Sequence, residues 1–422
     1  MLGPVPIDFI LFGFVLVGIA LFQRRTFEVA LTGLAVITAY KVLFAGFAQG
    51  AGLAGLWGLL AHEWVTLANL FLLLMGFALL AKHFEESQVP LVLPRVLPDD
   101  WKGGFLLLVL VFVLSTFLDN IAAALIGGTM ASGVFRGKVH IGYLAAIVAA
   151  SNAGGSGSVV GDTTTTMMWI DGVSPLDVLE AFVAAGSALC IFGVIAARQQ
   201  QGWSPIARDA SPDARVDWTR VAIVAAILGV AIVANVTANL RYPQVMDRWP
   251  VLGIAVWVMI LATAPLRRPD WSLMPQTLKG TVFLLSLVAC ASMMPVETLP
   301  AASWPTALGL GFLSAVFDNI PLTALALRQG GYDWGFLAYA VGFGGSMIWF
   351  GSSAGVALAN NFPEARNVRL WLRHGWHVAL AYVIGFFILL AVLGWHPNER
   401  HKPGQKPGAA QSVTTVTGSC IA

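Results

Sequence analysis

Charged residues are scarce in this chain. Only 11% of its 422 residues are Asp, Glu, Lys or Arg, whereas 57% are hydrophobic, and the mean hydropathy is +0.77. This composition excludes a soluble globular protein, and repeated apolar runs of about 20 residues are typical of a polytopic membrane protein. The three cysteines, two in apolar runs and one in the tail, predict no disulfide framework.

Two sequence features of other protein classes are also missing. No phosphate-binding Gly-Lys-Ser/Thr sequence occurs, which argues against ATP hydrolysis by this chain. No basic segment precedes the first apolar run, so we expect that run to be a membrane span and not a cleaved signal peptide.

One stretch, residues 147–170, stands out among the apolar runs. Its sequence, IVAASNAGGSGSVVGDTTTTMMWI, starts as an apolar helix, passes through glycines, serines, an aspartate and four threonines, and becomes apolar again. Irregular backbone at membrane depth is tolerated only where it is buried in protein or lines a polar cavity. The interruption therefore predicts a binding site within a broken membrane helix.

The apolar runs fall into two halves joined by a polar linker at 199–217. The first half, 1–198, contains predicted spans, a run centred on an Asp-Asn pair and the broken helix; the second, 218–395, contains the same elements. In the first half these are 7–22, 27–48, 64–82, the Asp-Asn run 104–134, the broken helix 139–170 and 176–197. In the second half they are 219–238, 249–265, 278–294, the Asp-Asn run 306–330, the broken helix 335–358 and 371–394. The tail, 396–422, is rich in Pro, Gly, Ser and Thr and is predicted to be disordered.

The two halves repeat each other in sequence. LSTFLDNIAAAL at 114–125 resembles LSAVFDNIPLTAL at 313–325, and NAGGSGSVVGDT at 152–163 resembles GFGGSMIWFGSS at 342–353. Two matches in the same order indicate a duplication.

The Asp-Asn runs could be straight spans or re-entrant hairpins. Hairpins leave five spans in each half and make the repeats inverted, whereas straight crossings give six spans and parallel repeats. Basic residues favour cytoplasmic loops. With hairpins and both ends outside, the inner loops collect most of the basic residues, whereas the outer loops hold only Arg241, Arg248 and Arg328. We therefore predict an all-α membrane protein of two inverted five-span repeats, each with a re-entrant hairpin and a broken helix.

Three aspartates are the strongest candidates for chemistry. Asp119 and Asp318 lie at the predicted hairpin tips, and Asp162 lies at the break. A charge at the bilayer centre costs about 2.5–3.5 kcal/mol on insertion scales, and no Lys or Arg is nearby in sequence to neutralise these groups. A sodium ion or a proton is the simplest partner. The alternative is that the aspartates only cap half-helices.

Neutral oxygens around these aspartates suit a hard cation such as sodium. The candidates are Asn120, Asn152, Thr163, Thr164, Asn319, Ser346, Ser352 and Ser353. The paired glycines Gly154, Gly155 and Gly344, Gly345 are expected to allow unwound backbone whose carbonyls face the ion. Ser352 aligns with Asp162, so the site should be asymmetric. Lys41, in an apolar run, is expected to extend its amine toward the interface.

These residues resemble the ion transporter superfamily of arsenite pumps, citrate and dicarboxylate permeases and NhaD-type sodium/proton antiporters. The NhaD type is the most similar, through Asn-Ala-Gly-Gly at 152–155, Gly-Asp-Thr-Thr-Thr-Thr-Met at 161–167, the Asp-Asn pairs, and Gly-Gly-Ser with Gly-Ser-Ser-Ala-Gly-Val at 344–356. The resemblance implies a homodimer with an elevator mechanism. The chain departs from the pattern at 156–160, where SGSVV replaces a Trp-Ser-Pro-Ile type of segment, a difference that bears on ion selectivity.

The resulting prediction is a sodium/proton antiporter of the plasma membrane, with sodium and protons as its ligands, no resident cofactor and no nucleic-acid partner. The alternative in the same fold is a sodium- or proton-coupled carrier of citrate, another carboxylate or an oxyanion. An intramembrane aspartyl protease would use Gly161-Asp162 and Tyr332-Asp333, but the residue at 159 is Val where the motif needs Gly, and the motif order is reversed. We therefore do not expect an enzyme.

Overall fold

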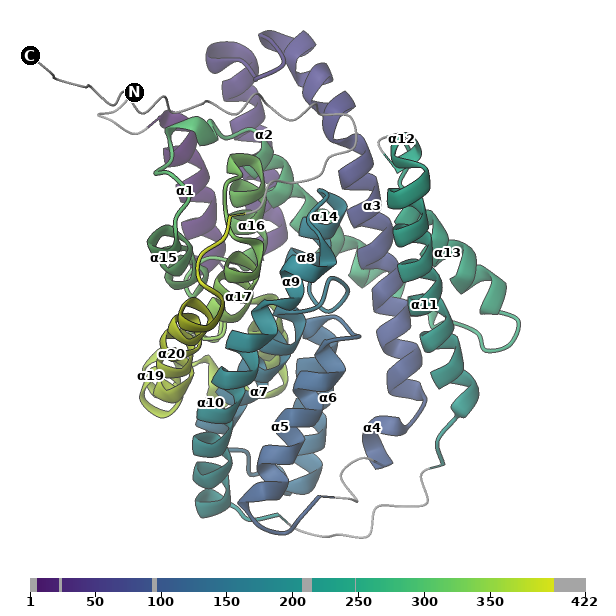
Figure 1. The fold of residues 1–422 in the computed structure, drawn as a ribbon, viewed down its shortest axis with the longest axis vertical. Helices are drawn as coiled ribbons and strands as arrows, with labels where there is room; N and C mark the ends of the chain where they lie inside the picture. The colour runs from purple at the N-terminus through teal and green to yellow at the C-terminus, as the bar shows by residue number, and fades with distance from the viewer. Residues whose placement is uncertain (1–5, 23–24, 93–96, 207–214, 247, 398–422) are drawn as a thin grey trace, which may run out of the picture.

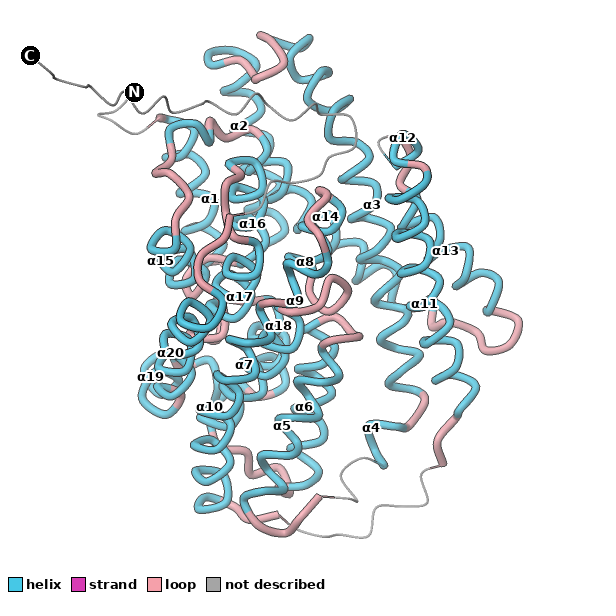
Figure 2. The backbone as a smooth tube through the Cα atoms, in the orientation of Figure 1, coloured by secondary structure: helices cyan, strands magenta, loops and turns pink. Residues whose placement is uncertain are grey.

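The structure is a computed structural model that describes residues 6–22, 25–92, 97–206, 215–246 and 248–397. These residues form helices joined by loops, and none of them lies in a strand (Figure 2). Most of the tail predicted to be disordered, and residues 207–214 of the predicted linker, lie outside the described residues.

A first group of six helices comes from the beginning of each half. These are α1 (Ile7–Leu21), α2 (Thr26–Tyr40), α3 (Gly52–Glu86), α11 (Trp218–Arg241), α13 (Val251–Thr263) and α14 (Met274–Ser292). By their order in the two halves, α11, α13 and α14 correspond to α1, α2 and α3, and their contacts correspond too. Helix α1 packs on α2, and α11 packs on α13. Helix α2 packs on α14 of the other half, and α13 packs on α3. We call these six helices the first helix group.

The helix that contains the third predicted span, 64–82, extends beyond that span at both ends. Helix α3 begins at Gly52, contains 35 residues and is therefore about 52 Å long, well beyond a hydrocarbon core of about 30 Å. His62 and Glu63 interrupt the apolar run but do not interrupt the helix, because both residues are tolerated in a helix that Leu and Ala dominate on either side.

The second helix group contains the two predicted hairpins and broken helices. The hairpin arms are α5 (Trp101–Ser115) with α6 (Asn120–Val134), and α15 (Trp304–Ser314) with α16 (Asn319–Gln329). The broken helices are α7 (Ile141–Ser156) with α8 (Thr163–Ile170), and α17 (Trp334–Gly344) with α18 (Ser353–Asn361). The helices of this group are interrupted at residues 116–119, 157–162, 315–318 and 345–352.

Shorter helices and two long ones complete the described chain: α4 (Val89–Val92), α9 (Pro175–Leu179), α10 (Ala181–Trp203), α12 (Pro243–Met246), α19 (Val368–His374) and α20 (Trp376–Leu393). Helix α10 continues into the predicted linker. The predicted last span, 371–394, is instead two helices that part at Gly375, where a side chain would meet the Trp371 carbonyl oxygen at 2.8 Å and Ala145 at 2.9 Å.

The hairpins and broken helices interlock across the two halves. Within each half the first hairpin arm packs on the first part of the broken helix, α5 on α7 and α15 on α17. Between the halves, α6 packs on α18 and α16 packs on α8. In Figure 1, α5, α6 and α7 lie side by side at the lower end, and α15, α16 and α17 lie on the upper left. All four helix breaks therefore converge on the middle of the second helix group.

Five described helices are long and apolar enough to cross a membrane, within Thr26–Ala45, Gly52–Glu86, Pro175–Trp203, Trp271–Ser292 and Trp376–Leu393. Shorter apolar helices accompany them, among them both arms of the first hairpin. An all-helical chain with these lengths and this hydropathy is a multi-pass membrane protein.

Lys41 does not extend toward the interface as predicted. Its Nζ atom lies 3.1 Å from Oδ1 of Asp8 in α1, and both residues are only 7% exposed. The pair forms where α2 widens into a π-helical turn, Lys41–Ala45. An ion pair in an apolar surrounding removes the need for the amine to reach water.

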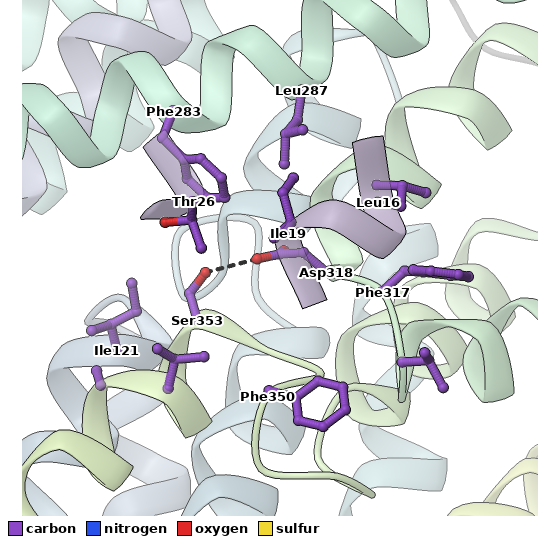
Figure 3. A pocket seen from close by; sticks show the side chains of 13 residues that line it. Leu16, Ile19, Thr26, Ile121, Phe283, Leu287, Phe317, Asp318, Phe350 and Ser353 are labelled. Carbon is purple, nitrogen blue, oxygen red and sulfur yellow. Dashed lines mark hydrogen bonds between the residues drawn. The ribbon is translucent and has the colours of Figure 1, made fainter. Parts of the chain in front are cut away.

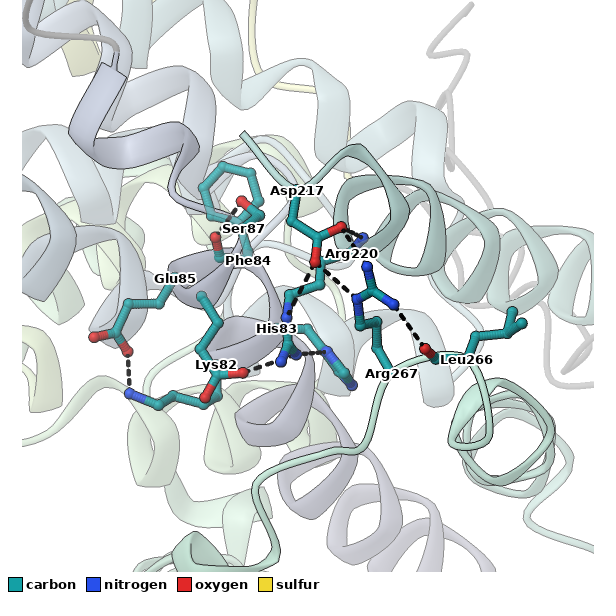
Figure 4. Close-up of polar contacts among 10 residues, drawn as sticks. Lys82, His83, Phe84, Glu85, Ser87, Asp217, Arg220, Leu266 and Arg267 are labelled. Atoms are coloured by element: carbon teal, nitrogen blue, oxygen red, sulfur yellow. Dashed lines mark hydrogen bonds and ion pairs between the residues drawn. The ribbon is translucent and has the colours of Figure 1, made fainter. Parts of the chain in front are cut away.

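A polar network at one end of the molecule ties the start of the second half to α3 (Figure 4). His83 and Glu86 of α3 both contact Nη1 of Arg220 in α11, at 2.8 and 2.7 Å. Asp217 caps α11 and accepts a hydrogen bond from Nε of Arg267 at 2.8 Å.

This network predicts a pH-dependent stability. The hydrogen bond from Arg267 lowers the pKa of Asp217 below its usual value of about 3.9. The stabilisation is therefore fully present above pH ~3.9 and is lost as the pH falls through the lowered pKa. We expect Asp217→Asn, which keeps a capping side chain, to lower the melting temperature slightly at pH 7 and to match the wild type in strong acid. Arg267→Gln should behave in the same way; a difference that does not change with pH would contradict this assignment.

Candidate cation-binding site

The two hairpin tips are built alike. Asp119 caps α6 and accepts a hydrogen bond from the Ile121 N–H at 3.3 Å, and Asp318 caps α16 through the Ile320 N–H at 3.2 Å. Asp318 uses its second oxygen to accept a hydrogen bond from Oγ of Ser353 at 3.0 Å. The capping role considered from the sequence is thus present at both tips.

Asp162 is the most buried of the three aspartates, with 2% of its surface exposed. Its Oδ1 atom caps α8 by accepting a hydrogen bond from the Thr164 N–H at 3.1 Å, and its Oδ2 atom lies 3.5 Å from Nδ2 of Asn319 at the second hairpin tip. Ser352 occupies the equivalent place in the second half, where it caps α18. One half thus presents a carboxylate where the other presents a hydroxyl.

Among the described residues, no basic side chain forms an ion pair with the three aspartates. Within the part of the chain that the structure describes, the ion pairs do not include Asp119, Asp162 or Asp318. The charges that act on the Asp162 carboxylate are those of Asp119 and Asp318, which repel it. Backbone N–H donors at helix N-termini offset only part of this cost. The negative charge of these carboxylates is therefore not balanced by any basic side chain of the described residues.

Asn152 joins the two halves at the centre of the site. Its carbonyl oxygen accepts a hydrogen bond from Nδ2 of Asn120 at 3.0 Å. Its own Nδ2 group donates to Oγ of Ser346 at 2.9 Å and to Oγ of Ser352 at 3.0 Å. All four side chains are buried. The side-chain amide of Asn152 in α7 thus connects the first hairpin tip to the second break.

Hydroxyl groups fix the backbone of the first break. Oγ1 of Thr165 donates to the Ser158 carbonyl at 2.6 Å, and Oγ1 of Thr166 donates to the Val159 carbonyl at 3.0 Å. Oγ of Ser158 in turn donates to the carbonyl of Thr116 in the first hairpin at 2.6 Å. Oγ1 of Thr164 is buried beside the Asp162 carboxylate and forms no well-aligned hydrogen bond, so its lone pairs are free inside the protein.

The prediction that the paired glycines allow an unwound backbone is wrong. Gly154 and Gly155 lie in the last turn of α7, and Gly344 ends α17, so their backbone is not unwound. They permit close approach instead, because a side chain at Gly154 would collide with the Phe112 carbonyl oxygen and one at Gly344 with that of Gly311. Gly345 is the cap residue of α17 and lies against Gly351 and Ser352.

Two cavities reach the aspartates from the side of the first helix group. The smaller, of about 10 Å³, has Asp119, Asp162, Thr163 and Thr166 on one side and Leu70, Leu73, Leu74 and Phe77 of α3 on the other. The larger, of about 220 Å³, ends at Asp318 and Ser353 (Figure 3). The structure thus brings Asp119, Asp162 and Thr163 to one cavity, and Asp318 to another.

Some residues that line the site cannot be recognised from the sequence. The α3 wall of the smaller cavity is made of ordinary apolar residues, and Thr166 was indistinguishable from its neighbouring threonines. Asp333, considered for a protease, caps α17 and accepts a hydrogen bond from the His396 N–H at 2.8 Å, which is a structural role.

The fold and the site together define a polytopic α-helical membrane protein with buried carboxylates at converging helix breaks. No known protein-family profile matches the chain. The chain is 27% identical over 292 residues to sodium/proton antiporter 1 of Arabidopsis thaliana, and the match covers 61% of this chain. It is 24% identical over 301 residues to sodium/proton antiporter 2 of the same plant, again covering 61% of this chain. The matches span 49% of the first relative's length and 68% of the second's.

Proposed function

We propose that this protein is a secondary active transporter that exchanges sodium for protons. The observation that carries the proposal is the set of three aspartates at the converging breaks, with Asp162 buried and no basic residue of the described chain paired to them. The distant relatives named sodium/proton antiporters support the same function.

The exchange follows from competition for one carboxylate. Buried Asp162, repelled by Asp119 and Asp318, is stable only when a proton or a cation neutralises it. A proton and a sodium ion cannot both occupy the same carboxylate oxygens, so binding of one releases the other. If the site moves between the two sides of the membrane only when it holds a proton or a sodium ion, the sodium flux and the proton flux are coupled.

The neighbouring groups supply the oxygens that a hard cation requires. We assign sodium to Asp162, Asp119 and Thr163 around the small cavity, together with the unpaired hydroxyl of Thr164. Asn120, Asn152, Ser346 and Ser352 act as a positioning network, since their hydrogen bonds hold the first hairpin tip against both breaks. Asn319 donates to Asp162 and thereby links the second hairpin tip to the ion.

We further propose an elevator mechanism in a homodimer of the plasma membrane with both termini outside. The two halves form inverted repeats, and the second helix group moves against the first. The cross-packing of α6 on α18 and α16 on α8 supports a rigid moving unit, since each hairpin is fixed to the other half's broken helix. The aspartate cavities lie between the two groups, where sliding would open and close them.

The test uses purified protein in liposomes that contain a pH-sensitive dye and carry a proton gradient. Sodium or lithium is expected to collapse the gradient, and potassium is expected to have a smaller effect. A response that requires citrate together with sodium would instead assign the same site to a sodium-coupled carboxylate carrier. No response to any of these ions would contradict antiport.

A further inference from the structure

The larger cavity differs in chemistry from an inorganic cation site. Its volume is about 220 Å³, and apolar residues from both helix groups form most of its wall (Figure 3). Leu16 and Ile19 come from α1, Phe283 and Leu287 from α14, and Phe317 and Phe350 from beside the second hairpin tip and second break. Among the described residues of the wall, the polar ones are Thr26, Asp318 and Ser353.

Asp318 is the single charged group among the described residues that line this cavity. One of its oxygens accepts from the Ile320 N–H at 3.2 Å and the other from the Ser353 hydroxyl at 3.0 Å. Carboxylate oxygens have further lone pairs, and no described Lys or Arg lines the wall to take them. An ionised Asp318 therefore gives the described wall of the cavity a net negative charge.

The walls favour a cation that brings its own apolar surface. Hard inorganic cations such as calcium and magnesium take about six or more oxygen ligands, far more than one carboxylate and two hydroxyls provide. An organic ammonium ion spreads its charge over a larger volume and needs fewer oxygens. Phe283, Phe317 and Phe350 also offer aromatic surface, and aromatic faces attract such cations.

We propose that this cavity binds monovalent organic cations with an apolar body, with aryl-substituted quaternary ammonium ions as the best-matched class. The cationic centre lies at the Asp318 carboxylate, and the apolar body lies against the walls from α1 and α14. Binding itself depends only on the cavity; competition with sodium rests on the proposed function, because it requires that Asp318 belong to the transport site.

The probe is benzyltrimethylammonium, added to the purified full-length protein in detergent while the melting temperature is recorded. We expect a saturable rise in melting temperature. Neopentylbenzene, which has the same shape without the charge, is the matched ligand control and should give no saturable rise. Asp318→Asn should weaken apparent affinity at least about tenfold, equivalent to 1.4 kcal/mol.

Two further variants keep the test decisive. Asp119→Asn removes the equivalent carboxylate at the other tip, next to the cavity of about 10 Å³, and should leave benzyltrimethylammonium affinity unchanged. Val356→Phe fills the larger cavity without touching the charge and should abolish the rise. Equal stabilisation by neopentylbenzene would overturn the proposal and assign the cavity to apolar molecules such as lipid chains. Unchanged affinity in Asp318→Asn would also overturn it.

The liposome assay separates this proposal from antiport. Benzyltrimethylammonium is expected to raise the sodium concentration needed for half-maximal exchange. Asp318-dependent binding by a protein without sodium-driven proton flux would support the ligand site and contradict antiport. Sodium-driven proton flux by a protein that does not bind the probe would support antiport and overturn the ligand site.

Discussion

Asp162→Asn is expected to lower sodium-driven proton flux at least ~100-fold, a rise of roughly 2.7 kcal/mol in the transport barrier. Asparagine can still cap α8, because its side-chain oxygen can accept the Thr164 N–H as the carboxylate does. It can neither take up a proton nor supply a negative charge to sodium. The coupling reaction should therefore fail while the fold persists, as measured with the dye-loaded liposomes.

The control for this variant is Asp177→Asn, which removes one carboxylate from α9, away from the helix breaks. It should retain wild-type flux. Both variants should elute as the wild type does in size-exclusion chromatography and melt at similar temperatures. Flux close to wild type in Asp162→Asn would transfer the coupling role to the tip aspartates and contradict the assignment made here.

Lys41→Met should destabilise the protein by about 3–5 kcal/mol, because removing one partner leaves the other charge buried and uncompensated. Asp8 is 7% exposed, and Lys41 is its ion-pair partner. Methionine matches the length and apolar stem of lysine, so little packing is lost. The melting temperature of the purified protein, with and without added lipid, measures the effect.

The double variant Asp8→Asn with Lys41→Met separates charge from packing. Since it leaves no buried charge at positions 8 and 41, it should be more stable than Lys41→Met alone. If the single variant melts like the wild type, the ion pair between Asp8 and Lys41 contributes nothing to stability. Such a result would restore the simpler view that Lys41 only extends toward the interface.

Close packing at the breaks explains why the glycine pattern does not lead to unwound backbone. Gly154 and Gly155 stand next to polar residues in an interrupted span, a pattern that fits unwound backbone as well as tight helix contacts. The decisive neighbour of Gly154 is the Phe112 carbonyl oxygen, which comes from a hairpin arm, and that of Gly155 is the Gly161 carbonyl oxygen, which lies in the break itself. The sequence around Gly154 does not show the approach of the hairpin arm, nor how the break folds back on Gly155.

The sequence by itself determined the helical membrane class, the positions of the four breaks and the placement of an aspartate at three of them. These features are local, since apolar run length and the interruption of a run by polar residues decide where a membrane helix can form and where it must stop. Asp119, Asp162 and Asp318 each cap the helix that their own sequence position predicts.

Only the tertiary structure decided which of these groups meet. Asn152 bonds to Ser346 and Ser352, 194 and 200 residues away, and Asn319 reaches Asp162 across 157 residues. The α3 wall opposite Asp119, the apolar cavity at Asp318 and the partner of Lys41 were likewise set by helix packing. Such contacts depend on how whole helices fit against each other, and many packings are compatible with the same apolar pattern.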